Sequence, residues 1–376
     1  MKKLLRMTLF LILSIVIVFA IAVAAFMNFH PVFGEKANAD QIKQYQKSKN
    51  FKDGIFQNGT KTIMEMGFWT GLKMIPEYLN KTGREPKFDI PVRKLDSLEI
   101  QKRIGQEARL TWFGHSTFLL EIDGLKVLID PMFGESPSPV AAFGSKRYSK
   151  ELPIEIEKLP EIDLVIFSHD HYDHLDYGSV LKLKDKVKQF YVPLGLGNHL
   201  IKWGINSEII KEMDWWEETS FKGLNLTCAP ARHFSGRGFG DRFSTLWASW
   251  AIKGQADNIF FSGDSGFGPH FKEIGERLGP FNFAMMECGQ YNERWENIHM
   301  TPEETIKASL DVQAKQMMPI HWGAFTLALH PWTESVIRAV AEAEKQNVTM
   351  VLPEIGQTFS LSNEPLPHTK WWEPFL

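Results

Sequence analysis

The segment 168–174, with sequence SHDHYDH, places three histidines and two aspartates directly after a continuous apolar run at 164–167. Imidazole and carboxylate groups are good zinc ligands. His169 and His171, two residues apart in an extended turn, can point at one ion, and Asp173 and His174 can serve a second. Without a cation, such crowding would be costly, so a solvated polar loop or a site for a single ion are the weaker interpretations.

Three further residues follow other predicted strands, at 224–229, 259–262 and 317–320; they are His233, Asp264 and His321. Taken alone, a histidine at a strand end is more often a polar residue whose hydrogen bonds are made within the protein than a metal ligand. Beside the first cluster, their places at strand ends favour ligation. Asp264 has two oxygens and can bridge both ions. The sequence thus predicts one ion held by His169, His171, His233 and Asp264, and the other by Asp173, His174, His321 and Asp264, each with room for water.

Two residues are candidates for supporting this site. Asp130 ends a strand before Pro131, and it can accept a hydrogen bond from a ligand imidazole, although ordinary capping of the strand end is the alternative. His115 could contact a ligand or support the metal-binding loop, and we expect a structural role. Four tryptophans are expected in the core rather than at the site: Trp215, Trp216, Trp247 and Trp250.

The elements that position these residues are short β-type runs interleaved with a few helices. Strands are predicted at 109–113, 118–122, 126–129, 164–167, 189–192, 224–229, 247–252, 259–262, 283–286, 317–320 and 349–352. Helices are predicted at about 176–186, 270–278, 302–313 and 332–346. This alternation indicates a layered α/β or α+β domain. The first strand is not followed by a glycine-rich phosphate loop, so neither a P-loop nor a dinucleotide fold is supported.

The N-terminal segment 7–27 carries no charge and is long enough to span a membrane. Lys2, Lys3 and Arg6 precede it, which predicts a cytoplasmic N-terminus and an extracytoplasmic catalytic domain in the cell membrane. A cleaved signal peptide, giving a secreted protein, is the alternative.

The stretch 61–79 mixes methionine and aromatic residues. We expect a helix packed on the main domain, with a membrane-facing or substrate-gating surface as the alternative.

Composition limits the functional classes. The chain has 376 residues and a net charge of −3, so it lacks the basic field by which proteins hold nucleic acid. Its only cysteines are Cys228 and Cys288, too few for a cysteine-based zinc site, although one disulfide could form.

The chain divides into four parts by these patterns. We expect an anchor at 1–28, an N-terminal extension packing on the main domain at 29–105, the hydrolase domain at 106–362 and a tail at 363–376.

Ten stretches in family order resemble the metallo-β-lactamase superfamily and, more closely, its N-acylphosphatidylethanolamine-hydrolysing phospholipase D family. They are TWFGHST (111–117), LIDP (128–131), SHDHYDHLDYGSV (168–180), VPLGLG (192–197), MDWWEE (213–218), WASWAI (247–252), SGDSGFGPHFKEIGERLGPF (262–281), YNERW (291–295), HMTPEE (299–304) and IHWGAF (320–325). The histidine and aspartate motif is common to the superfamily, whereas the tryptophan-rich and YNERW…PEE blocks are more specific. The resemblance covers roughly 107–330, outside the membrane segment.

This resemblance implies an αββα sandwich, an α/β (α+β) fold, with metals at one sheet edge. It also implies that His299 faces the substrate, against the alternative of a surface histidine at a helix start. Tyr291 and Arg294 are candidate phosphate contacts.

The expected reaction is attack by a hydroxide shared between two zinc ions on the phosphorus of an N-acylphosphatidylethanolamine-like lipid. Asp173 would orient the hydroxide or take its proton, and His299 would protonate the leaving alcohol or hold the phosphate.

Other functions stay open at this point. The same site could hydrolyse a lactone, an amide or a β-lactam in a small soluble substrate. A nuclease is disfavoured by the missing basic charge, and a noncatalytic binding or envelope-assembly protein is disfavoured by the intact ligand set. The sequence leaves the oligomeric state open, a homodimer included.

Overall fold

The computed structural model describes residues 1–64, 67–102, 105–362 and 365–376. Within them, two seven-stranded sheets form the body. The first has the order β16-β3-β4-β5-β6-β7-β8 and the second β15-β14-β13-β12-β11-β10-β9. The first contains β3 (Arg109–Trp112), β4 (Phe118–Ile122), β5 (Leu125–Ile129), β6 (Leu164–Ile166), β7 (Phe190–Pro193), β8 (Ile210–Met213) and β16 (Thr358–Ser360). The second contains β9 (Glu218–Phe221), β10 (Leu224–Ala229), β11 (Ser249–Lys253), β12 (Asn258–Phe261), β13 (Phe283–Glu287), β14 (Gln316–Ile320) and β15 (Thr349–Met350).

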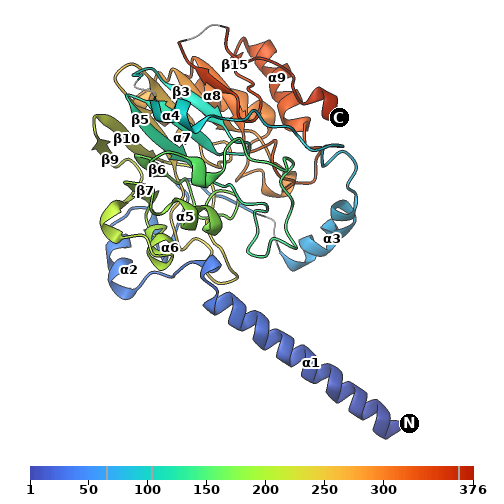
Figure 1. Ribbon diagram of the computed structural model, residues 1–376. Coiled ribbons are helices and arrows are strands. Elements are labelled where there is room, and N and C mark those ends of the chain that lie inside the picture. The colour runs from blue at the N-terminus through green and yellow to red at the C-terminus, as the bar shows by residue number, and fades with distance from the viewer. Residues whose placement is uncertain (65–66, 103–104, 363–364) are drawn as a thin grey trace.

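Helices cover the outer faces of this sandwich (Figure 1). They are α4 (Ser97–Lys102), α5 (Tyr177–Leu183), α6 (Gly197–Lys202), α7 (His270–Leu278), α8 (Pro302–Asp311) and α9 (Glu334–Gln346). Successive side chains of β4 point to opposite faces of the first sheet, which shows how the layers are built. Phe118 and Leu120 join the large core shared with the second sheet, whereas Leu119 joins the cluster packed under α5 and α6. The predicted αββα sandwich is therefore present.

The predicted elements differ from the observed ones mainly at their boundaries and edges. The four helices predicted between the strands of the main domain are all present, and α7 spans 270–278 as predicted. The strand predicted from Trp247 begins at Ser249. Strands β8, β9 and β16 and helix α6 were not predicted. Trp215, Trp247 and Trp250 are buried, which confirms their place in the core, and Trp216 is partly buried against it. The two cysteines are buried thiols.

Residues before and after the sandwich pack onto it. Tyr45 of α2 (Ala39–Tyr45), with Phe51 and Phe56 of the hairpin β1 (Phe51–Lys52) and β2 (Ile55–Phe56), belongs to the main core. At the other end, Trp372 is buried, and the ring of Trp371 stacks on that of Trp322 with centroids 5.3 Å apart. Of the stretch 61–79, residues 65–66 lie outside the described part, and Phe68–Leu79 form α3.

One helix in the described residues, α1 (Lys2–Phe29), is long and apolar enough to cross a membrane, and it contains no buried residue. The chain after it is held tightly to the body. The indole Nε1 of Trp203 donates to the carbonyl of Pro31 at 2.6 Å, and the guanidinium Nε of Arg237 donates to that of Val32 at 2.9 Å. Gly34 has φ +77°, and a Cβ there would lie 2.0 Å from Nδ1 of His199, so only glycine fits.

Truncation before residues 30–36 and truncation after them should therefore have different effects on stability. A chain beginning at His30 keeps the hydrogen bonds that hold residues 31–35 to the body and loses only contacts of α1 itself, such as that of Phe26 with Phe33. It should therefore unfold close to the temperature of the full chain. A chain beginning at Ala37 loses the hydrogen bonds from Trp203 and Arg237 to residues 31 and 32, the hydrogen bond from the Glu35 N–H to His199, and the packing of Val32. That loss costs about 2 kcal/mol, and Tm should fall by several degrees in a calorimetric scan. Equal Tm values for both truncations would contradict this role of residues 30–36.

Candidate metal centre

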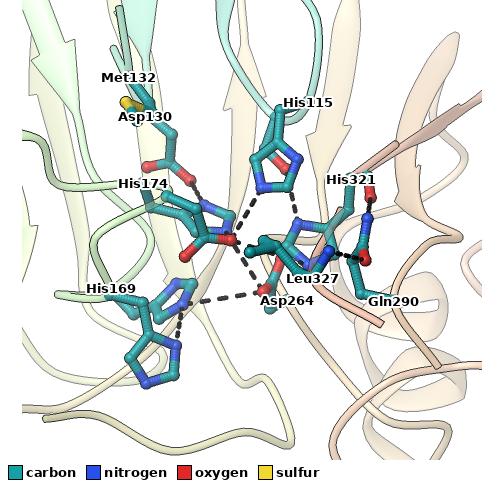
Figure 2. Close-up of polar contacts among 12 residues, drawn as sticks. His115, Asp130, Met132, His169, His174, Asp264, Gln290, His321 and Leu327 are labelled. Carbon is teal, nitrogen blue, oxygen red and sulfur yellow. Dashed lines mark hydrogen bonds and ion pairs between the residues drawn. The ribbon is translucent and has the colours of Figure 1, made fainter. Parts of the chain in front are cut away.

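The seven predicted ligands meet at one edge of the sandwich. The segment 169–174 follows β6, and single residues follow β10, β12 and β14: His233, Asp264 and His321. Figure 2 shows Asp264 between the imidazoles of His169, His174 and His321. The sheets thus bring together residues that are up to 152 positions apart in the chain, from 169 to 321.

Three histidine rings form one half of the cluster. Nε2 of His169 lies 2.9 Å from Nδ1 of His171, which lies 3.2 Å from Nε2 of His233. Burial, reinforced by neighbouring histidines, holds the pKa of His169 well below its usual value; burial does the same to the pKa of His233. These rings are therefore neutral, the form in which imidazole binds a metal. Oδ2 of Asp264 lies 3.8 Å from Nε2 of both His169 and His233.

The other half contains Asp173, His174 and His321, together with His115. Asp264 reaches this half too. Its Oδ2 lies 3.2 Å from Nε2 of His174, and its Oδ1 lies 3.2 Å from Nδ1 of His321. The ligand atoms of His115, Asp173, His174 and His321 all lie within 4.8 Å of one another. His115, which we expected to contact a ligand or support the metal-binding loop, lies beside the potential ligands, with its Nε2 2.8 Å from Oδ2 of Asp173.

Two observations show that this donor set fits cations. In the described part of the chain, the buried atoms His174 Nε2 and Asp264 Oδ1 have no hydrogen-bond partner, although each has a cluster atom 3.2 Å away. Burial raises the pKa of Asp264, yet the surrounding imidazoles, His174 first, outweigh it and hold that pKa well below its usual value. A buried carboxylate that stays ionised because positive charge adjoins it is the chemistry of a metal site.

Outer contacts fix the orientation of the rings. Asp130 accepts hydrogen bonds from the backbone N–H of Ser168 and from Nδ1 of His174, both at 2.7 Å, so that Nε2 of His174 faces the cluster. Asp170, the remaining aspartate of the motif, accepts from the backbone of Gly236 at 2.8 Å and from the hydroxyl of Thr245 at 3.0 Å. It ties the loop to the segment 236–245.

The chain segments around the cluster lie close together, and several of their residues have an unusual backbone conformation. A Cβ on Gly263 would lie 2.7 Å from the carbonyl of Ala248 and 2.9 Å from Cβ of Ser168, so glycine is needed beside Asp264. Three non-glycine residues have positive φ here: His115 (+55°), Asp130 (+40°) and His321 (+67°). Such conformations cost free energy and cluster at functional sites.

A cavity of about 200 Å³ opens onto the cluster, and His299 lines it together with His171, Asp173, Asp264 and His321. Apolar groups complete the wall, among them Phe234, Trp295, Ile298 and Leu327. Sequence reasoning missed Glu287, which ends β13 beneath His299. Its Oε1 lies 3.2 Å from Nδ1 of His299, and its Oε2 accepts from the backbone N–H of Met300 at 2.9 Å. Burial raises the pKa of Glu287 to about 7.

Tyr291 and Arg294 do not line this cavity; both bind protein groups instead. The hydroxyl of Tyr291 donates to Oε1 of Glu334 at 2.5 Å. Arg294 forms a two-pronged ion pair with Glu77 of α3, at 2.9 and 2.6 Å. The geometry thus gives these two residues a structural role where we expected phosphate contacts.

Similarity to known proteins agrees with this geometry. The family model of the beta-lactamase superfamily domain matches residues 126–322. An uncharacterized protein of Mycobacterium tuberculosis is 40% identical over 333 residues, which are 87% of this chain and 88% of that protein. An N-acyl-phosphatidylethanolamine-hydrolyzing phospholipase D of Caenorhabditis elegans is 32% identical over 291 residues. These residues are 73% of this chain and 81% of the phospholipase.

The chain belongs to the metallo-β-lactamase superfamily. It is a metal-dependent hydrolase of this superfamily that resembles the N-acylphosphatidylethanolamine-hydrolysing phospholipases D. Solved structures support the fold. A metallo hydrolase from Ignicoccus hospitalis matches with a TM-score of 0.51 at 20% identity over 68% of this chain and 99% of that chain. An isothiocyanate hydrolase from Delia radicum gut bacteria matches with a TM-score of 0.54 at 20% identity. The match covers 67% of this chain and 99% of the hydrolase.

Asp264→Asn should remove metal from both halves of the site, because a neutral amide bridges two cations poorly. His233→Ala should deplete mainly one ion and His321→Ala the other. Elemental analysis of protein purified without chelator measures this directly, with circular dichroism to verify folding. His368→Ala, whose ring lies outside the cluster against the carbonyl of Met350, is the matched control and should keep the full metal content. Wild-type metal in all three site variants would overturn the ligand assignment.

Proposed function

We propose that the protein is a zinc-dependent phosphodiesterase of phospholipase D type, with two zinc ions, that acts on N-acylphosphatidylethanolamine-like lipids. The observation that carries this proposal is the cavity itself. It joins a candidate metal cluster to His299 from the HMTPEE block, and apart from Gln290 and Tyr78 the rest of its wall is apolar. Its volume of about 200 Å³ suits a phosphate and its neighbouring atoms rather than acyl chains. The similarity to the Caenorhabditis elegans phospholipase supports the lipid class.

The chain's own residues divide the work. His169, His171 and His233 would hold one ion and Asp173, His174 and His321 the other, with Asp264 between them and His115 beside Asp173. Zinc bound there would supply an activated water and positive charge against the phosphate oxygens. Asp173, whose pKa is held far below normal because the nearby His174 and His115 outweigh its burial, is an ionised carboxylate that can orient the water or accept its proton.

His299 is the candidate for contact with the leaving oxygen. Burial lowers its pKa, but the carboxylate of Glu287 outweighs burial and raises that pKa, which favours the protonated ring. With Nδ1 directed at Glu287, the other ring nitrogen is left for the cavity, where it can hold the phosphate or protonate the departing alcohol. Glu287 thus acts through His299 as a positioning residue.

The cellular setting is part of the proposal. We propose that α1 anchors the chain in the cell membrane as a single span, with the catalytic domain on the extracytoplasmic side, because Lys2, Lys3 and Arg6 precede the apolar run. Protease added to spheroplasts of a bacterial host should digest the catalytic domain while a cytoplasmic marker survives. Digestion only after lysis would place the domain in the cytoplasm and contradict the charge argument.

Phosphodiesters should be cleaved better than lactones or β-lactams, with N-acylphosphatidylethanolamine among the better lipids. His299→Ala should lower kcat for phosphodiesters by about 10²–10⁴-fold, the range of a lost acid or base, and leave both metals bound. Glu287→Gln should give a smaller loss and a displaced pH profile. Mass spectrometry should detect phosphatidic acid together with N-acylethanolamine. Much faster turnover of a lactone or β-lactam by the metal-replete enzyme would refute the phospholipase proposal and leave the fold and the family standing.

A further inference from the structure

Helix α3 presents an apolar face whose side chains are exposed to solvent. Trp69, Leu72, Ile75 and Leu79 recur at helical spacing, and the exposed fractions of Trp69 and Leu79 are 74% and 77%. The opposite face is fixed to the body: Met74 is buried with Trp295, and Glu77 pairs with Arg294. A helix anchored on one side and apolar on the other is typical of an interaction surface.

This face lies on the side of the molecule where α1 leaves it. In Figure 1, α3 projects from the body on the side toward which α1 runs. One loop connects the two regions, because Arg237 binds the carbonyl of Val32 beside α1 and Arg242 contacts the sulfur of Met64 just before α3. Phe239, between these arginines, is 94% exposed. Since residues 30–35 are clamped to the body, a membrane spanned by α1 would meet this side in a fixed orientation.

The same face borders the cavity and a basic cleft. Tyr78 of α3 lines the cavity at the metal cluster and also lines a neighbouring cleft of about 1020 Å³. That cleft holds the exposed side chains of Lys81, Lys87 and Lys146 against two acidic residues, and the exposed rings of Phe88 and Phe143 also line it. Its two arginines, Arg84 and Arg147, donate instead to backbone carbonyls of the body. Apolar side chains next to cations match the boundary between acyl chains and anionic headgroups.

We propose that the exposed face of α3, with Phe88, Phe143 and the basic cleft, is a second membrane contact that rests on the anionic lipid surface of the bilayer crossed by α1. Acyl chains of a bound lipid then stay in the bilayer beside α3 while the phosphate enters past Tyr78. The contact itself requires only the anchor, whereas this route for a lipid rests on the proposed phospholipase activity.

Site-specific labelling tests the contact without relying on activity. Both native cysteines are buried, so an introduced exposed cysteine can be labelled selectively. Full-length Leu79→Cys and Ile337→Cys proteins, carrying a polarity-sensitive fluorophore, are placed in nanodiscs of phosphatidylcholine and phosphatidylglycerol. Ile337 on α9 is the control, with an exposed fraction of 46%. The label at 79 should shift to the blue and be quenched by brominated lipids, whereas the label at 337 should report water.

A charge substitution tests the consequence for catalysis. The double variant Leu72→Asp/Leu79→Asp should turn over nanodisc lipid at least about tenfold more slowly than wild type while keeping wild-type rates on a soluble phosphodiester. The matched control Leu310→Asp/Ile337→Asp should match wild type on both substrates. A label at 79 that reports water overturns the proposed contact, even in an active enzyme. A bilayer-buried label in a protein that cleaves no phosphodiester refutes the proposed activity and supports the contact.

Discussion

The burial of Asp264 among imidazoles is the constraint on which the rest of this structure depends. A carboxylate removed from water keeps its charge only where opposing charge or hydrogen bonds replace hydration. Here its two oxygens face His174 and His321 at 3.2 Å, with two more histidines at 3.8 Å. Three separate loops must converge on the loop that carries this side chain. Two sheets whose strand ends share an edge supply that convergence, and the sandwich can be understood as the scaffold that holds these loops together.

The loops are also fixed to one another beyond the cluster. Asp130 holds Ser168 and His174 on one side of the motif, while Asp170 holds the loop of Gly236 on the other. Arg237 then extends this network outward, because its buried guanidinium donates to the carbonyls of Val32 and Leu175. A single side chain therefore links the segment after α1 to the metal-binding loop. Preorganisation of the cluster and orientation of the body relative to α1 share the same interactions.

Sequence reasoning found what depends on local pattern and side-chain chemistry. The buried strands and the amphipathic helices were recognisable because their apolar periodicity is strong, and the motif residues because few other arrangements use so many imidazoles. Strands β8 and β9 were missed because both lie at sheet edges, where mixed polar residues such as those of Glu218–Phe221 carry little β signal. Strand β16 pairs with β3 across more than two hundred residues, which no local pattern encodes.

The site residues that sequence reasoning missed or could not place have a common feature: their roles are set by contacts across the fold. Glu287 ends a fully buried apolar strand, where a carboxylate would ordinarily be excluded, and that placement was a signal that could have been used. His115 has a positive φ and exchanges backbone hydrogen bonds with the His321 region, so its closeness to Asp173 follows from the pairing of two distant loops. Tyr291 and Arg294 illustrate the converse, because polar groups in a motif with family resemblance can stabilise the wall of a site without facing its substrate. Arg294 shapes the cavity indirectly, since its ion pair with Glu77 fixes the helix from which Tyr78 reaches the opening.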